Sequence, residues 1–238
     1  LMPVVYRTIP VLMMHAREFD FPHEPYPTVH YAGPMINVSQ RASGKPENAE
    51  LTALLEKHNT PAHDRRLIYC TFGTFIRQND LDFIVRLVRA VEGQANYDVV
   101  FGLGKRHTAE AIRHASGTDL PNNVYIFDWV PQLQVLEKAD CAVHHGGTST
   151  VNECIYYEVP MLLYPLGIDQ KGNAARVAYH NMGILGDRNR DTPEQIRQHL
   201  ATLMDDGQYR SSLQTMKRAI DDAGCNPAAT FVEQLLSR

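Results

Sequence analysis

The chain has few cysteines and no cysteine motif. Its 238 residues contain four cysteines, and no two of them form a CxxC pair. This usage argues against a disulfide framework. Because three of the four lie in apolar runs, we expect free thiols and a reducing, cytoplasmic setting; the four are Cys70, Cys141, Cys154 and Cys225.

Long apolar runs and basic clusters are also missing. No run approaches the roughly 18 to 20 apolar residues of a membrane-spanning helix, and no basic-then-apolar leader opens the sequence. The formal net charge is -4 at a pI of about 6.3, and Lys and Arg are scattered. Net charge gives no drive toward nucleic acid or acidic membranes, so local geometry must hold any anionic ligand.

Familiar cofactor and metal fingerprints are incomplete. The run GLGK at 102–105 has no third glycine for a dinucleotide fingerprint and no Ser or Thr after its lysine for a P-loop. Two cysteines and two histidines between residues 141 and 154 could suggest zinc, but strand alternation points His144 and His145 to opposite faces. We therefore expect neither a metal nor a cofactor.

What the chain does have is a regular alternation of short β-rich runs with helical ones. Apolar runs joined by helices predict a parallel sheet covered on both faces, a doubly wound, Rossmann-like α/β fold. Its ligand crevice lies at the carboxyl ends of the strands. The expected strands are 67–73, 97–104, 123–127, 141–145 and 161–164, and the expected helices are 79–92, 108–115, one opened by Pro131, 148–157 and 171–181.

Two flanks differ from this core. Residues 20–46 hold five prolines, which predicts an extended linker over 23–46 that leaves an earlier unit, 1–22. The main domain then spans 47–238 and ends in a helical tail after Thr192. Because the chain starts at Leu1 in what reads as mid-domain sequence, we expect a piece of a longer protein; the prolines are Pro22, Pro25, Pro27, Pro34 and Pro46.

The turn from His145 to Thr150 joins a buried strand to a helix. Unpaired backbone N–H groups and the positive dipole end of a helix start favour an anion. Glycines such as Gly147 allow close approach of a phosphate, while Thr148, Ser149 and the histidine add side-chain donors. The competing interpretation is an ordinary glycine turn with a Ser/Thr cap.

Glu153 falls three residues after Thr150 and so shares its helix face. A carboxylate there can accept hydrogen bonds from the two hydroxyls of a ribose. Thr150-x-x-Glu153 is also the pattern of a capping box, which is the structural alternative.

Trp129, the only tryptophan, follows a predicted strand and precedes Val130 and Pro131. A ring in this position can stack on a nucleotide base, and Gln132 on the same loop can hydrogen-bond the base or ribose. Most lone tryptophans are core residues, which is the alternative here.

Two further pairs sit at the same sheet edge. Asp169 and Gln170 can bind neighbouring hydroxyls of a sugar, although Asp169 also suits an ordinary helix N-cap. Gly73 and Thr74, which end the first predicted strand, can supply a second phosphate contact.

Taken in order, these elements resemble the donor-binding signature of the UDP-glycosyltransferase superfamily, whose members have the two-domain GT-B architecture. The matching segments are WVPQ, HHGGTSTVNE, Val159-Pro160, Pro165, Asp169-Gln170, Asn173 and Arg176, and HYAGPM and IYCTFGT match less specifically. Gly147-Thr148 is similar to bacterial and animal members rather than to plant ones.

The resemblance implies a role for each matching residue. Trp129 would stack on the base, Val130 would contact it through its backbone, and Gln132 and Glu153 would bind the ribose. His145 and residues 147–150 would hold the pyrophosphate with help from Thr74, and Asp169 and Gln170 would hold the sugar. The family's catalytic histidine belongs to the amino-terminal domain, so we expect no catalytic residue in this chain.

The resemblance therefore predicts the donor-binding domain of an inverting glycosyltransferase. Its partners would be a nucleoside diphosphate sugar, with UDP favoured, and a small, lipophilic acceptor bound by the missing amino-terminal domain. Two alternatives stay open: a non-catalytic nucleotide-sugar-binding subunit of a split enzyme, and a sugar-nucleotide epimerase.

Overall fold

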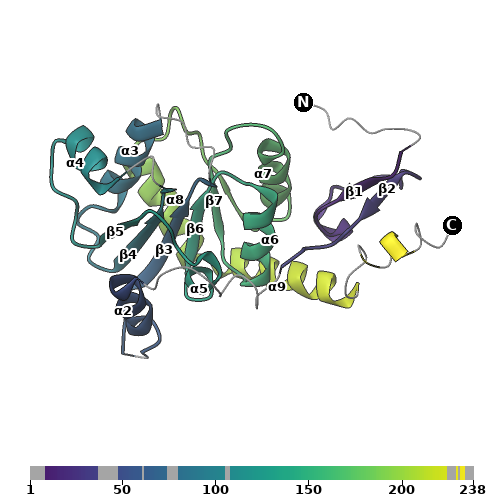
Figure 1. Cartoon of the computed structure of the whole chain (residues 1–238), viewed down its shortest axis with the longest axis horizontal. Coiled ribbons are helices and arrows are strands. Elements are labelled where there is room, and N and C mark those ends of the chain that lie inside the picture. Colours follow the sequence, from purple (N-terminus) through teal and green to yellow (C-terminus); the bar gives the residue numbers. More distant parts are fainter. Residues whose placement is uncertain are drawn as a thin grey trace.

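The computed structural model describes residues 9–36, 48–60, 62–73, 80–104, 108–223, 229 and 231–233. Its centre is a six-stranded sheet in which every pair of neighbours is parallel (Figure 1). The strands are β3 (Arg66–Thr71), β4 (Tyr97–Gly102), β5 (Val124–Phe127), β6 (Cys141–His144), β7 (Met161–Leu163) and β8 (Gly183–Leu185).

The order of the strands creates a reversal point between β3 and β6. Across the sheet the order is β5-β4-β3-β6-β7-β8, so the chain builds outward from β3 in one direction and then from β6 in the other. Thr71 at the end of β3 pairs with Gly102 on one side and with His144 on the other. A doubly wound fold binds its ligands outside the carboxyl ends at such a point.

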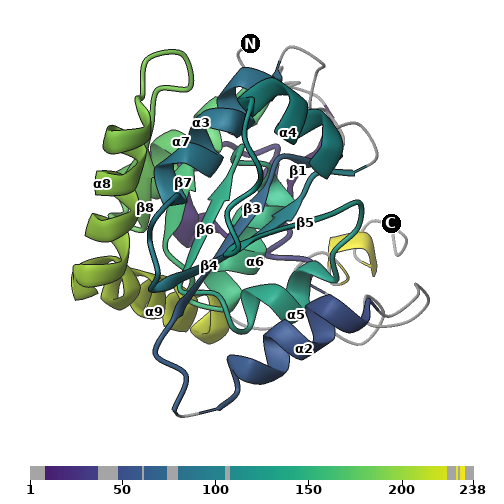
Figure 2. The same cartoon turned by 90° about the vertical axis from the view of Figure 1, so that its left-hand side faces the viewer.

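Helices cover both faces of the sheet, as Figure 2 shows. One apolar core joins the sheet to α3, α4 and α8, and the other joins it to α2, α5, α6, α7 and α9. This arrangement confirms the predicted fold class. The helices are α2 (Ala49–Lys57), α3 (Leu81–Val91), α4 (Ala109–Ser116), α5 (Gln132–Leu136), α6 (Thr148–Tyr156), α7 (Gln170–Tyr179), α8 (Pro193–Asp205) and α9 (Gly207–Asp222).

Strand β3 shows why its central residues are apolar. Ile68 and Cys70 point into one core, whereas Leu67 and Tyr69 point into the other. Because successive side chains alternate between faces that are both covered, each of them is buried. Full burial of one such aliphatic side chain contributes roughly 1.5 to 3 kcal/mol.

The residues at the helix starts show where several helices begin. Thr192 and Gln195 form a reciprocal capping box at the start of α8, with a proline as the first helical residue. Asp80 occupies the N-cap position of α3, but its side chain makes no capping hydrogen bond and instead pairs with Arg188. Pro131 stands at the N-cap of α5, so that helix begins one residue later than predicted.

The segment before the main domain is ordered by its own contacts. Strands β1 (Val11–Met13) and β2 (Val29–Tyr31) form a parallel pair that stands apart from the main sheet (Figure 1). Between them Phe19 is buried in the same core as α9, and Asp20 accepts hydrogen bonds from Tyr31 and Arg176, each at 2.7 Å. Burial opposes the charge of Asp20, but these two bonds outweigh it and lower its pKa to about 2.

Several elements were not predicted from the sequence: α2, β8 and the β1–β2 pair. The helical tail also divides into α8 and α9 at Asp206. Among the described residues, Cys70, Cys141 and Cys154 are free, buried thiols, as expected. No described helix combines the length and the apolar character that crossing a membrane requires.

Candidate functional site: a cleft at the sheet reversal

A cleft of about 580 Å³ opens at the carboxyl ends of β3, β4 and β5. The loops after these strands, the start of α5 and the start of α6 line it. Six of the residues predicted from the sequence line it together: Gly73, Trp129, Val130, Gln132, Ser149 and Thr150.

Trp129 lies at the rim of this cleft. Its side chain is 39% exposed, whereas Val130 next to it is buried. A residue exposed to this extent is not a core residue, so the structure does not support a core role for this tryptophan.

A chain of hydrogen bonds crosses the floor of the cleft. The hydroxyl of buried Tyr69 donates to Gln132 Oε1 at 3.2 Å, and Gln132 Nε2 donates to Thr150 Oγ1 at 3.4 Å and to the carboxylate of Glu153. Gln132 and Glu153, which are 21 residues apart, thus share one polar cluster. Tyr69 was missed in the sequence because it reads as an ordinary apolar strand position.

The capping-box interpretation of Glu153 is wrong. Helix α6 has Gly147 at its N-cap and no side-chain capping bond, so Thr150 is its third helical residue. Glu153 lies within the helix and is only 3% exposed. A buried carboxylate is costly without partners, and this one is directed at Gln132 on the cleft floor.

The start of α6 offers backbone donors to the cleft. Ser149 and Thr150 belong to its first turn, whose N–H groups have no partner within the helix. No acidic or basic residue lies in that turn. The positive end of the helix dipole therefore faces the cleft without a charged side chain of its own helix to compensate it.

His145 is packed between two glycines. A Cβ on Gly147 would lie 2.7 Å from the ring Nε2, and one on Gly73, whose φ is +65°, would lie 3.0 Å from Cε1. Burial lowers the pKa of His145, although the Thr71 backbone and the charge of Asp169 oppose the shift. The ring Nδ1 is buried and has no hydrogen-bond partner among the described residues. At neutral pH the ring is therefore an uncharged donor or acceptor.

His144 faces away from His145, as strand alternation predicted. Its Nδ1 accepts a 3.1 Å hydrogen bond from the N–H of Gly146, whose φ is +84°, and its Nε2 lies 3.9 Å from the sulfur of Cys154. Burial and the neighbouring His145 lower the pKa of His144 to about 3. A neutral His144 thus fixes the shape of the glycine turn.

Asp169 lies against the start of α6. Its Oδ2 accepts from the N–H of Thr148 at 3.3 Å, from the Thr148 hydroxyl at 2.8 Å and from Asn173 Nδ2 at 3.0 Å. It makes no capping bond to its own helix, α7. The carboxylate consequently touches the same helix start that faces the cleft.

Gln170 is buried and holds a loop. Its Oε1 accepts hydrogen bonds from the N–H groups of Leu166 at 2.7 Å and Gly167 at 3.1 Å. The amide oxygen is therefore occupied within the protein. Of the remaining predicted residues, Thr74 falls outside the described part of the chain.

Comparison with known proteins identifies the family of the chain. Residues 96–237 match the family model "Erythromycin biosynthesis protein CIII-like, C-terminal domain". The zeaxanthin glucosyltransferase of Pantoea ananas is 28% identical over 92% of the chain, which spans 47% of that protein.

Solved structures show the same fold. The chain matches the crystal structure of the glycosyltransferase of kitacinnamycin with a TM-score of 0.76 and 25% identity, over 94% of the chain and 54% of that protein. A spinosyn rhamnosyltransferase, SpnG, solved with thymidine diphosphate, gives a TM-score of 0.70 at 20% identity, over 96% and 56%.

The chain thus spans about half the length of these relatives. The family model covers more than half of the chain, and the neighbours have the GT-B architecture. The chain belongs to the family of erythromycin biosynthesis protein CIII-like C-terminal domains, the donor-binding half of GT-B glycosyltransferases.

Proposed function

We propose that the cleft binds a nucleoside diphosphate hexose, with UDP favoured, as the donor of an inverting transfer to a hydroxyl of a small, lipophilic acceptor. The observation that carries the proposal is the meeting of Trp129 and Gln132 with the start of α6 in one cleft. An aromatic ring and a helix start that line one cleft suit a base and a pyrophosphate of the same ligand.

In this arrangement the nucleoside would lie over the floor cluster. Glu153 would accept hydrogen bonds from the ribose hydroxyls, and Gln132 would hold the carboxylate in place. The pyrophosphate would then reach the N–H groups of Ser149 and Thr150. Charge that develops on the departing diphosphate would be stabilised by the helix dipole and by an N–H of neutral His145.

We place the catalytic base outside this chain. In an inverting transfer, a base removes the proton of the acceptor hydroxyl while the oxygen attacks the anomeric carbon, and the diphosphate leaves from the opposite side. The donor half contributes binding and leaving-group stabilisation to that step. The isolated chain should therefore bind donor and turn over little or none of it.

Ligand-induced stabilisation tests the proposal directly. At 100 times the dissociation constant, a ligand stabilises the folded state by about 2.7 kcal/mol. For a chain of this size such a gain corresponds to a rise in Tm of roughly 5 to 10 °C. We expect this rise with UDP or UDP-glucose, measured by scanning calorimetry, and TDP is titrated in parallel.

Uridine and inorganic pyrophosphate, each lacking half of the ligand, serve as controls and should shift the Tm far less. A Tm unchanged by millimolar UDP, UDP-glucose and TDP alike would refute a nucleotide site in this cleft.

A second prediction separates the sugar from the diphosphate. Asp169→Ala should weaken binding of UDP-glucose by about tenfold or more, because a hydrogen bond to a charged group contributes about 1.5 to 3 kcal/mol. Binding of UDP should not weaken, because UDP lacks the sugar and removal of the carboxylate relieves its repulsion of the phosphates. Titration calorimetry with both ligands measures the ratio.

The matched control is His145→Ala, which should weaken both ligands to the same extent because the ring lies beside the glycines of the phosphate turn. If Asp169→Ala reduces the affinity for UDP and UDP-glucose equally, the sugar-facing role of Asp169 is wrong.

A further inference from the structure

A second cluster of functional side chains lies at the opposite end of the sheet from the cleft. It consists of His58, His63 and Asp98, whose potential ligand atoms all lie within 4.8 Å of one another. Asp98 is the second residue of β4 and pairs in register with Leu67 near the start of β3. The cleft is formed where these strands end, so the cluster belongs to a different part of the molecule.

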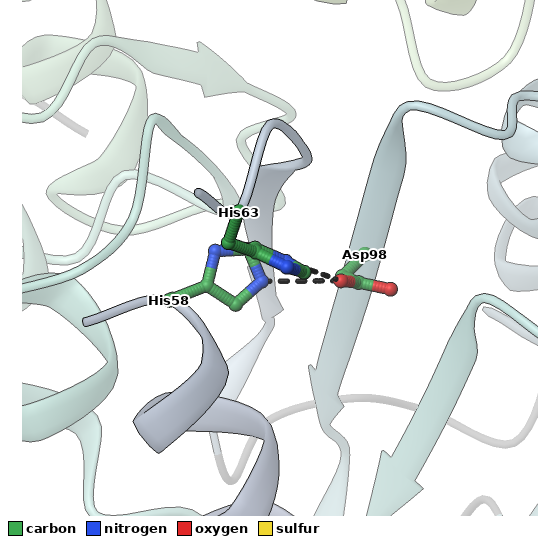
Figure 3. Close-up of side chains that lie close together, drawn as sticks. All are labelled: His58, His63 and Asp98. Carbon is green, nitrogen blue, oxygen red and sulfur yellow. Dashed lines mark hydrogen bonds and ion pairs between the residues drawn. The ribbon is translucent and has the colours of Figure 1, made fainter. Parts of the chain in front are cut away.

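Three separate pieces of the chain bring the cluster together. His58 follows the last residue of α2, His63 lies on the connection to β3, and Asp98 projects from β4. Figure 3 shows both imidazole rings directed at the same carboxylate oxygen. The Nε2 atoms of His58 and His63 lie 3.1 and 3.4 Å from Asp98 Oδ2.

We propose that His58, His63 and Asp98 form a zinc-binding site. Zinc binds imidazole nitrogen and carboxylate oxygen at about 2.0 to 2.2 Å, and tetrahedral geometry then separates neighbouring ligand atoms by about 3.4 Å. The two nitrogen-to-oxygen distances of the cluster match this separation. Two histidines and one carboxylate also form a recognised set of three protein ligands for a divalent metal.

Hydrogen bonding alone does not account for the cluster. His58 is hydrogen-bonded to Asp98 Oδ2, but His63 Nε2 is buried and makes no hydrogen bond within the described part of the chain. A buried polar atom without a partner is costly. A metal ion between the two rings and Oδ2 would satisfy it.

Residues around the cluster orient its ligand atoms toward a bound cation. Arg65 pairs with the other carboxylate oxygen, Oδ1, at 2.9 Å, which orients Oδ2 toward the rings as an outer partner does in metal sites. The His63 side chain as a whole is 19% exposed, which places the cluster close to the surface, from which a metal ion can enter.

A zinc ion here would fasten α2 to the sheet. Leu51 and Leu54 are the buried residues of this helix. The site would join its end to β4 through the metal. This role is structural and independent of the proposed donor site, so zinc should raise the Tm without changing the affinity for UDP.

The test is a zinc titration of the chain, freed of metal by chelation, with ZnCl₂ in competition with a chromophoric chelator. A Cys225→Ser background removes the one thiol outside the described residues. We expect one zinc per chain, a raised Tm, and visible Co²⁺ absorption bands of four- or five-coordinate intensity. His63→Gln should weaken zinc binding at least about tenfold, since loss of an outer partner alone costs that much.

His58→Gln is the second ligand variant, and His114→Gln, which alters an exposed histidine on α4, is the matched control. Circular dichroism of the metal-free variants verifies that each one folds. No zinc binding at micromolar concentration, or equal binding by the wild type and both ligand variants, would overturn the proposal. Loss of binding in His114→Gln alone would also overturn it.

Discussion

Glu153→Ala is expected to weaken the binding of UDP about 100-fold or more. In the proposed complex the carboxylate accepts hydrogen bonds from two ribose hydroxyls, and each such bond to a charged group contributes about 1.5 to 3 kcal/mol. Two of them correspond to at least a hundredfold in affinity. The substitution also removes one of the two acceptors of the Gln132 amide, which leaves only Thr150 Oγ1.

A deoxy ligand makes this prediction specific to the ribose. Wild-type protein should bind UDP more tightly than 2'-deoxyuridine diphosphate, and Glu153→Ala should lose most of that preference. Titration calorimetry with both nucleotides measures the difference, and Glu153→Gln, which keeps one acceptor oxygen, should be intermediate.

Glu137→Ala is the matched control for Glu153→Ala. Glu137 also lines the cleft, but its carboxylate is exposed and pairs with neighbouring Lys138. Its removal changes the net charge by the same amount and should alter the affinity for UDP by less than about threefold, since exposed ion pairs contribute about 1 kcal/mol or less. If Glu153→Ala folds and still prefers UDP over 2'-deoxyuridine diphosphate as strongly as the wild type does, Glu153 does not bind the ribose.

Gly183→Ala is expected to destabilise the fold by roughly 3 kcal/mol or more. Gly183 begins β8 and pairs with Met161 of β7. A Cβ at this position would overlap the carbonyl oxygen of Met161 and lie 2.9 Å from Val177 Cγ1. A clash with backbone cannot be relieved by a rotamer change, so the strand must move, and overpacking of this kind costs about 1 to 3 kcal/mol or more.

Urea denaturation followed by circular dichroism measures the loss. Gly207→Ala is the control, because Gly207 is the first residue of α9 and has open space where a Cβ would be. That substitution should be neutral or should stabilise by about 0.4 to 1 kcal/mol, since alanine has fewer unfolded conformations to lose. Gly183→Ala within about 0.5 kcal/mol of the wild type would show that β8 tolerates a side chain.

The sequence predicted the central strands well because each is a continuous apolar run covered on both faces. β8 was missed because it has only three residues, GIL, and these form a strand through their pairing with β7. Helix α2 was missed for a similar reason, since only Leu51 and Leu54 of its nine residues are buried. The pairing of β1 with β2 joins residues that are 18 positions apart in the sequence, and no local sequence pattern predicts such a contact.

The order of the motifs along the sequence predicted where the cleft lies. Only the contacts in the structure decided between the competing interpretations of single residues. The pattern Thr150-x-x-Glu153 fits a capping box until the helix start is fixed at Gly147, one turn earlier. Asp169 does stand at the N-cap of α7, but its carboxylate bonds to Thr148 on another helix instead of capping α7. The proposed zinc site could not be predicted, because Asp98 lies 40 residues from His58 and the two side chains meet only in the folded chain.

Helix α7 contacts both the proposed donor site and the segment before the main domain. Asn173 in its first turn hydrogen-bonds Gly146 O and Asp169 beside the proposed donor site, while Arg176 holds Asp20 of the segment before the main domain. These two anchors are about 4.5 Å apart along one helix axis. A helix that is held at both points moves as one body. Residues 9–36 therefore cannot shift relative to the sheet without either breaking the Arg176–Asp20 pair or tilting α7 where it contacts the glycine turn.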